Sequence, residues 1–354
     1  MKVRIPVAPL RAPSRPSSLP PTKAFAIERI ASLLRDGNVL ALTGAGVSVD
    51  SGIRAYRGND GRYMNPNYHP IFYHELVDST PVGHKFRQRY WARSYFGYPP
   101  VRDAQPNPTH YAIAALQHAN LVSRLITQNV DGLHPKALSG VPGWTQERVQ
   151  SRILELHGML RMVHCKNGHV MSREEFQTSL AELNPTLRAI SDEFEQSGAM
   201  PRRNPDGDVE LEGVNYADVV VPECKDCAKE KGIHNSILKP NVVFFGETID
   251  QHLKDRAMNQ VYNCRSVLVI GTTLATYSAY SLVKRAHELN KPIMVLNVGP
   301  TRADELSGVE KFEWTSGEVL QEVCKTILGS DAGDDIVIRK LLDSGVIKAI
   351  SDES

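Results

Sequence analysis

Short apolar segments of strand length recur along this chain, and helical patterns lie between several of them. The segments are 38–43, 121–127, 241–245, 266–270 and 292–297, and all are rich in β-branched or large aliphatic side chains. A helical pattern over 278–289 separates the last two. Strands buried on both faces have such near-continuous apolar runs, and crossover helices join them in parallel. The alternation therefore predicts an α/β fold with a doubly wound parallel sheet.

This alternation breaks after His157 and resumes only near residue 239. The intervening stretch holds Cys165, Cys224 and Cys227, together with a polar, glycine-containing segment at 201–213. A segment too small to bury a large core of its own usually needs a metal or another cross-link. We therefore expect a small inserted module that binds a metal.

These patterns divide the chain into four parts. The predicted ranges are 1–22 for an N-terminal arm, 23–156 and 239–328 for the Rossmann-like sheet domain, 157–238 for the inserted module, and 329–354 for a C-terminal tail. Within the tail, 336–350 has the pattern of a terminal helix.

The N-terminal arm has no acidic side chain, and the first acid of the chain is Glu28. Its basic residues are separated by serines and prolines. An arginine-bearing, serine-bearing and acid-poor composition is typical of a mitochondrial transit peptide. The alternative is a disordered basic arm, because the prolines oppose a continuous helix.

Charge and hydropathy exclude two kinds of partner. The net charge is +1, which gives no reason to expect nucleic acid. No apolar run approaches the roughly 20 residues that cross a bilayer, so we expect no membrane partner. The odd total of five cysteines argues against a disulfide framework and for a reducing compartment.

The first chemical motif is a glycine turn directly after the strand at 38–43. Glycines at 44 and 46 let the backbone approach a pyrophosphate. The third glycine of the usual dinucleotide fingerprint is missing, so the turn alone is compatible with a purely structural role. It continues through Ser51-Gly52-Ile53 to Tyr56-Arg57.

Two further motifs follow strand-like segments. The sequence Thr-Gln-Asn-Val-Asp-Gly-Leu-His fills 127–134, at the end of a strand, where ligands bind in doubly wound sheets. By itself it is equally a polar turn capped by Asn129 and Asp131. His157 is followed by Gly158, and an imidazole that titrates near neutrality suits a general base, although a lone histidine is more often structural.

Together these motifs resemble the sirtuin family of NAD-dependent protein deacylases. The resemblance extends from about residue 23 to 328, and the segments 86–93 and 105–110 favour the class II branch, which has a mitochondrial animal member. It implies that NAD is consumed as a co-substrate, and that His157, Asn129 and Asp131 carry the chemistry. The positions that it assigns to NAD are Gly44, Ala45, Gly46, Ser48, Ser51, Gly52, Ile53, Tyr56, Arg57, Gln128, Asn129, Asp131, Gly271, Thr272, Thr273, Asn297, Val298, Gly299 and Ser316.

The same resemblance implies an acylated lysine of a protein as the second substrate. Its peptide would pair with the backbone of the segment Val243-Phe244-Phe245-Gly246-Glu247 by strand addition. The products would be nicotinamide, free lysine and O-acyl-ADP-ribose. A mono-ADP-ribosyltransferase with the same NAD site and a non-catalytic NAD-sensing scaffold are the alternatives. The acyl group stays open, because Arg54 and Arg93 either pair with an acidic chain or lie at the surface.

The cysteines indicate a structural zinc site that is incomplete by the family's pattern. Cys224 and Cys227 form a Cys-x-x-Cys pair, which supplies two tetrahedral positions. The family has a second such pair, but here Cys165 is followed by Gly168 where a cysteine is expected. We predict one zinc ion held by Cys165, His169, Cys224 and Cys227; His164 is another candidate ligand, and a module without metal is the alternative.

The compartment follows from the branch and the arm together. We expect a mitochondrial matrix protein, and otherwise a cytoplasmic or nuclear one.

Overall fold

The structure is a computed structural model, and it describes residues 21–56, 70–197, 214–232, 236–329 and 335–349. The predictions for Arg57 and for nearly all of the N-terminal arm lie outside the described residues. None of the described helices is long and apolar enough to cross a membrane.

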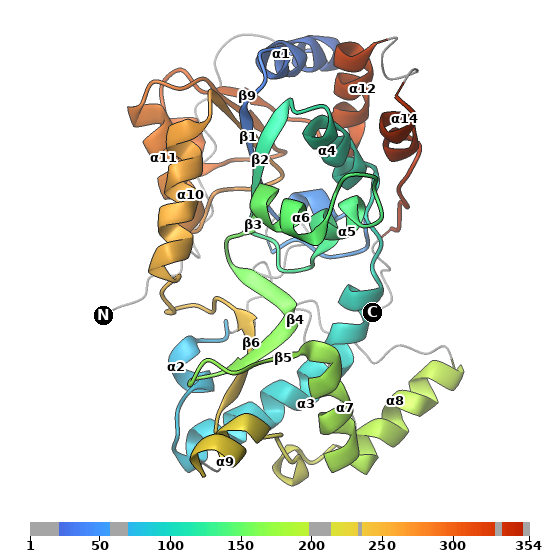
Figure 1. The fold of residues 1–354 in the computed structure, drawn as a ribbon, viewed down its shortest axis with the longest axis vertical. Helices are drawn as coiled ribbons and strands as arrows, with labels where there is room; N and C mark the ends of the chain where they lie inside the picture. The colour runs from blue at the N-terminus through green and yellow to red at the C-terminus, as the bar shows by residue number, and fades with distance from the viewer. Residues whose placement is uncertain (1–20, 57–69, 198–213, 233–235, 330–334, 350–354) are drawn as a thin grey trace.

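A parallel sheet of six described strands forms the larger unit (Figure 1). Its strands are β1 (Val39–Thr43), β2 (Val122–Thr127), β3 (Ile153–Glu155), β7 (Ser266–Ile270), β8 (Ile293–Leu296) and β9 (Glu310–Phe312). They lie side by side as β3-β2-β1-β7-β8-β9, which is the order 3-2-1-4-5-6 of a doubly wound dinucleotide-binding sheet. The order reverses between β1 and β7, and such a switch point is where ligands bind. The predicted fold class is confirmed.

Helices cover both faces of this sheet because apolar side chains alternate between two cores. One core contains residues of α1, α4, α5, α12 and α14, and the other contains residues of α10 and α11. The bounds on the first side are α1 (Lys23–Arg35), α4 (Pro108–His118), α5 (Leu133–Leu138), α6 (Gln146–Arg152), α12 (Ser316–Leu328) and α14 (Ile336–Leu342). Those on the second side are α10 (Gln251–Asn263) and α11 (Tyr277–Glu288).

The smaller unit contains a three-stranded antiparallel sheet in the order β5-β4-β6. Its strands are β4 (Gly158–Cys165), β5 (Val170–Ser172) and β6 (Leu238–Val242), and its helices are α7 (Arg173–Leu183), α8 (Pro185–Ser197) and α9 (Lys225–Lys231). The predicted strand over 241–245 therefore differs from the structure in position and partner. The apolar run begins three residues earlier and pairs with β4, so it does not belong to the parallel sheet.

The long helix α3 (Pro81–Asp103) also packs on the smaller unit, after the short α2 (Tyr73–Leu76). Trp91, Ala92 and Phe96 of α3 share a core with Phe176 and Leu238. The smaller unit therefore contains more than the predicted range 157–238, because α3, which precedes that range, contributes to its core. The two units meet where β3 leads into β4 (Figure 1).

The C-terminal tail ends its helix earlier than predicted. α14 stops at Leu342, and Gly345 has a positive φ of 121° that a helix cannot contain. The chain then returns to the larger unit, where the Lys348 amide donates a hydrogen bond to the Asp50 carbonyl at 2.8 Å.

Candidate active site and metal cluster

A cavity of about 1420 Å³ lies where the carboxyl ends of the parallel strands face the smaller unit. Most of the residues predicted to bind NAD or the peptide line this cavity. Those that line it are Gly44, Ala45, Gly46, Tyr56, Gln128, Asn129, His157, Val243, Phe244, Phe245, Gly246, Glu247, Gly271, Thr272, Thr273, Asn297, Val298 and Ser316.

The glycine turn after β1 packs directly on the loop after β7. The Gly46 amide donates to the Gly271 carbonyl at 2.9 Å. A Cβ added at Gly46 would lie 2.8 Å from the Gly271 Cα and from its carbonyl oxygen, closer than real Cβ contacts. The glycine thus lets two switch-point loops close into one backbone wall of the cavity.

A buried hydrogen-bond network lies directly behind this wall. The Asn129 amide donates to the Gly44 carbonyl at 3.0 Å and to the Ser48 hydroxyl at 3.1 Å. Ser48 in turn donates to the Asp131 carboxylate at 2.7 Å. Burial raises the pKa of Asp131 above its ordinary value. The network fixes the orientation of the Asn129 side chain. It also connects the glycine turn after β1 to the motif at 127–134.

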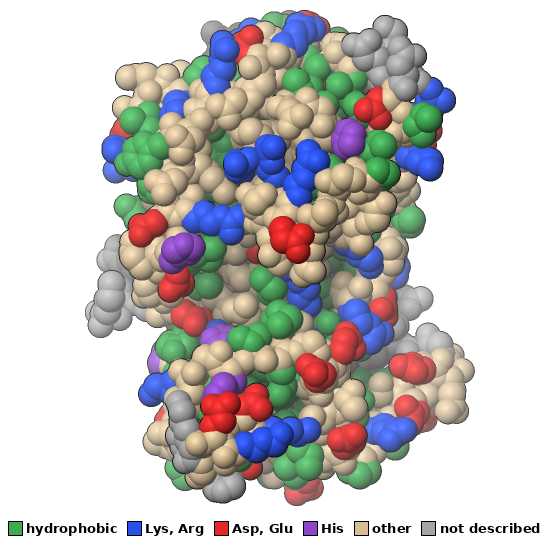
Figure 2. Space-filling view, in the orientation of Figure 1, with side chains coloured by type: hydrophobic (Ala, Val, Ile, Leu, Met, Phe, Trp, Pro, Cys, Tyr) green, Lys and Arg blue, Asp and Glu red, His purple; other side chains and the backbone are tan. Residues whose placement is uncertain are grey.

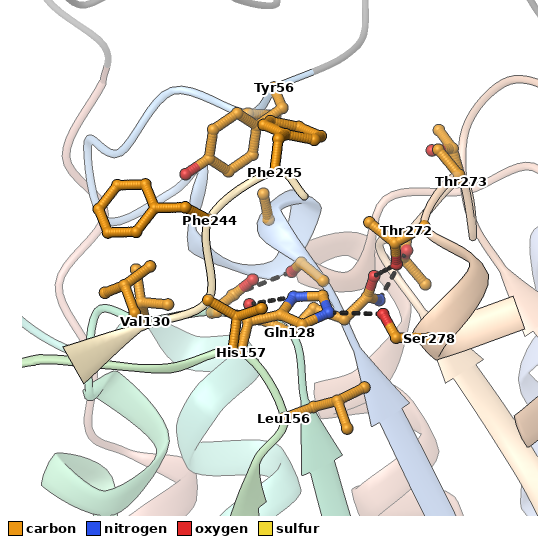
Figure 3. A pocket seen from close by; sticks show the side chains of 18 of the residues that line it. Tyr56, Gln128, Val130, Leu156, His157, Phe244, Phe245, Thr272, Thr273 and Ser278 are labelled. Carbon is orange, nitrogen blue, oxygen red and sulfur yellow. Dashed lines mark hydrogen bonds between the residues drawn. The ribbon is translucent and has the colours of Figure 1, made fainter. Parts of the chain in front are cut away.

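His157 projects into the centre of the cavity and is held at both ring nitrogens (Figure 3). Nδ1 lies 3.3 Å from the Gln128 carbonyl, and Nε2 lies 2.8 Å from the Ser278 hydroxyl. A carbonyl only accepts, so Nδ1 carries the proton and Nε2 accepts from Ser278. Burial lowers the pKa of His157 to about 4. The ring is therefore neutral near pH 7, and Nε2, the nitrogen that accepts from Ser278, is the one able to take up a proton.

Gly158 is required where the segment after His157 crosses into the smaller unit. Its φ is +81°, and an added Cβ would lie 2.0 Å from the Asn241 carbonyl oxygen. Just after β6, the Val243 amide donates to the His157 carbonyl at 2.9 Å. A backbone hydrogen bond thus joins His157 directly to the predicted peptide-binding segment.

A buried ion pair shapes the segment predicted to bind the peptide. Lys239 is only 5% exposed, and its Nζ lies 3.2 Å from Oε1 of Glu247. Oε2 of Glu247 accepts the Phe244 amide at 2.9 Å. Lys239 also donates to the Val242 carbonyl at 3.0 Å. The lysine therefore fixes both ends of the loop that turns under Phe244 and Phe245.

Some predicted site residues do not line the cavity. Ser48 and Asp131 lie behind the wall, as described, and Ile53 and Gly299 are also absent from the lining. Ser51 and Gly52 face the C-terminal tail instead. Ser51 forms an isolated bridge with Lys348, and a Cβ added at Gly52 would lie 3.3 Å from Cδ of Lys348.

Four metal-binding side chains of the smaller unit converge as predicted. The donor atoms of Cys165, His169, Cys224 and Cys227 all lie within 4.8 Å of one another. His169 Nδ1 is 3.5 Å from the sulfurs of Cys165 and Cys224 and 3.3 Å from that of Cys227. The Cys165 and Cys227 sulfurs are 3.6 Å apart. Tetrahedral zinc requires separations of about 3.5 Å for sulfur to nitrogen and about 3.8 Å for sulfur to sulfur.

The surroundings of these donors also suit zinc. A hydrogen bond from the Asn167 amide holds the pKa of the Cys227 thiol below its ordinary value, which favours the thiolate. Glu230 lies 3.0 Å from the second ring nitrogen of His169, and such a carboxylate orients a ligating imidazole. The alternative ligand, His164, is not in the cluster, because its Nε2 contacts Lys239 Nζ at 3.2 Å.

The structure adds Tyr90 and Tyr98 of α3, which line the cavity and which the motifs did not identify. Of the two arginines considered for an acidic acyl chain, Arg93 lines the cavity and Arg54 does not. Ser278 and Lys239 gave no signal at all, because neither belongs to a motif whose chemistry is recognisable from spacing.

The family follows from comparison with known proteins. The Sir2 family model matches residues 44–278, from the glycine turn to the serine that contacts His157. This chain belongs to the Sir2 family.

Two similar proteins and one solved structure agree with this result. The NAD-dependent protein deacylase SIR4 of Batrachochytrium dendrobatidis is 41% identical over 296 residues, which cover 82% of this chain and 90% of that protein. The mitochondrial NAD-dependent protein lipoamidase sirtuin-4 of Homo sapiens is 37% identical over 304 residues, with coverages of 85% and 86%. A crystal structure of a Sir2 homologue in complex with NAD has a TM-score of 0.56 at 27% identity and covers 89% of this chain and 95% of that one.

Proposed function

We propose that this protein is an NAD-dependent protein lysine deacylase in which His157 is the general base. The observation that carries the assignment of His157 is its position. A neutral imidazole lies in the cavity between the switch-point loops and the segment 243–247, with its proton on Nδ1. NAD-dependent deacylation is also the activity named for the relatives.

The residues of the chain divide the work of the reaction. The loops at Gly46 and Gly271 present backbone groups to the dinucleotide, and Gln128 and Asn129 present amides to its sugar and carboxamide. The segment 243–247 pairs with the substrate peptide. The acyl oxygen attacks the anomeric carbon of the nicotinamide ribose, and nicotinamide leaves. His157 then accepts the proton of a ribose hydroxyl at Nε2, the sugar oxygen attacks the acyl carbon, and the lysine leaves as the free amine when water completes O-acyl-ADP-ribose. Such base catalysis contributes about 10²- to 10⁴-fold.

The four-donor cluster holds one zinc ion in this proposal. The ion joins β4 and its turn to α9 and takes no part in the acyl transfer, since the donors belong to the smaller unit and none of them lines the cavity. Elemental analysis of purified protein is expected to give about one zinc per chain. A fully folded protein without metal would refute this part.

We also propose a mitochondrial location. The support is the acid-poor N-terminal arm and the mitochondrial relatives from Homo sapiens and Bos taurus. The full chain with a C-terminal fluorescent tag is expected in mitochondria, and the same chain without residues 1–22 outside them. Identical distributions of the two would contradict the proposal.

The acyl group is identified by a panel of lysine peptides that carry acetyl, succinyl, methylglutaryl or lipoyl groups. Each is incubated with NAD and the full chain, and nicotinamide release and peptide mass are followed. At least one peptide is expected to lose its acyl group in proportion to the nicotinamide released. A peptide that instead gains the mass of ADP-ribose would show transfer to protein and contradict the proposed function.

A further inference from the structure

Arginines from three separate elements meet at the amino edge of the parallel sheet, the edge opposite the active site. Arg124 lies in β2, Arg152 ends α6 and Arg256 lies in α10. We call these three residues the arginine cradle. Figure 2 shows Lys and Arg side chains gathered on this face, over β2 and towards α10.

The cradle borders a cavity of its own. Arg124 and Arg256 line a hollow of about 750 Å³ together with Asn38, Gln150 and Gln260. No residue of this lining also lines the active-site cavity. Its volume lies within the range of about 300–1,000 Å³ that is usual for small-molecule sites.

The charges of the cradle are not neutralised within the described part of the chain. Arg124 and Arg152 both donate to the Ser123 carbonyl, at 2.8 and 2.9 Å, and Arg256 donates to the Gln150 carbonyl. No carboxylate among the described residues lies within 4.0 Å of any of the three guanidinium groups. Asp255 lines the same hollow and accepts the Gln251 amide at 2.8 Å, so one negative charge lies beside the three positive charges.

The three cations act on one another. Burial lowers the pKa values of Arg152 and Arg256, and the positive charge of Arg124 lowers both further. Like charges at short range destabilise the folded state unless an anion lies between them. Arg124 and Arg152 share one carbonyl, and Arg124 and Arg256 border one hollow, so the three side chains form a connected set.

The floor of the hollow carries a polar group without a partner. Gln260 is only 8% exposed, and its Oε1 is buried without a hydrogen bond. Its amide forms no hydrogen bond with any described residue. The Gln260 amide nitrogen, unlike Oε1, is not among the buried atoms without a partner, and as a donor on the lining it suits an anion in the hollow.

We infer that the arginine cradle binds a small phosphate-bearing anion at a site separate from the NAD cavity. Guanidinium groups match the geometry of phosphate oxygens bidentately, and several of them converge here from different elements. The limited size of the hollow and the net charge of +1 favour a small molecule over a nucleic acid.

The test uses inorganic pyrophosphate as the probe on the full chain. The NAD cavity is first saturated with ADP-ribose, so that the pyrophosphate-binding loops of the active site are already filled. Calorimetric titration then measures pyrophosphate binding to the wild type, Arg124→Gln and Arg256→Gln. Arg188→Gln, an exposed arginine of α8 near Asp192, is the matched control for the loss of one charge.

The wild type and the control are expected to bind pyrophosphate with equal affinity, and each cradle variant at least about 10-fold more weakly. Without the probe, Arg256→Gln is expected to unfold at the same or a higher temperature, because a repulsion has been removed. Absence of binding to the ADP-ribose-saturated wild type would overturn the proposal. Equal binding by the wild type and both cradle variants would overturn it as well.

Discussion

The hydroxyl of Ser278 controls how His157 presents its basic nitrogen, and Ser278→Ala tests that geometry. The 2.8 Å contact with Nε2 and the 3.3 Å contact of Nδ1 with the Gln128 carbonyl are the two polar contacts of the ring among the described residues. Alanine keeps the helix start of α11 intact and removes only the donor. The buried ring then keeps one contact and gains freedom to turn.

The size of the effect follows from that loss. A buried acceptor left without its donor costs about 1–3 kcal/mol. Each ~1.36 kcal/mol corresponds to a factor of ten, so a cost near the lower end of this range reduces the fraction of protein with a correctly oriented ring by about 10-fold. Binding of NAD is expected to be unaffected, because the backbone wall at Gly46 and Gly271 and the amides of Gln128 and Asn129 stay in place.

The assay separates the two chemical steps. Exchange of labelled nicotinamide into NAD reports its reversible release, and free lysine peptide reports the acyl transfer that needs the base. Ser278→Ala is expected to lower kcat for free peptide about 10-fold, with exchange within about twofold of the wild type. Ser281→Ala, on the same helix with its hydroxyl on the Ser278 carbonyl, is the control and is expected to behave as the wild type. An unchanged kcat in Ser278→Ala, or an equal loss of exchange and deacylation, would refute the reasoning.

Three further predictions concern the substrate loop, the metal and acid stability. Lys239→Met leaves Glu247 without its ion-pair partner and is expected to raise the KM for acyl peptide at least about fivefold, while the KM for NAD changes little. Lys239→Arg is expected to restore the KM for acyl peptide in part. Equal changes in both KM values would contradict the role of the pair. Chelation of the metal is expected to lower the melting temperature and to expose the cluster thiols to alkylation, and unchanged thiol protection would argue against a bound ion. Burial lowers the pKa of His134 to about 3 and that of His157 to about 4, so as the pH falls below about 6.5 these histidines take up protons in the unfolded chain before they do so in the folded protein. Each histidine is therefore expected to lower the free energy of unfolding by about 2 kcal/mol at pH 5. A free energy of unfolding that is the same at pH 7 and pH 5 would contradict this.

The parallel sheet was largely predictable because four of its strands are long enough to show an apolar run. β3 and β9 have three residues each, too few for any periodicity, and they were not predicted. The segment near 241 was recognised as a strand but given the wrong sheet, since an apolar run does not specify its partner. Its pairing with β4 depends on where the chain returns within the smaller unit, and the local sequence does not encode that position.

Motif residues in the site were predictable for a different reason: their chemistry requires fixed spacing. The zinc donors illustrate this, because His169 could be proposed from its place after Cys165. Ser278 and Lys239 could not, since a serine at a helix start is usually a surface residue and a buried lysine is rare. Their roles come from contacts between elements that only the tertiary structure brings together.

The most direct test of the central claim is a comparison of the full chain with His157→Ala, using NAD and an acyl peptide from the panel. Mass spectrometry is expected to detect nicotinamide, free lysine peptide and O-acyl-ADP-ribose in equal amounts from the wild type. The variant is expected to keep its melting temperature and its affinity for NAD and to form no free lysine peptide. A folded His157→Ala protein that deacylates at the wild-type rate would contradict the assignment of His157 as the base.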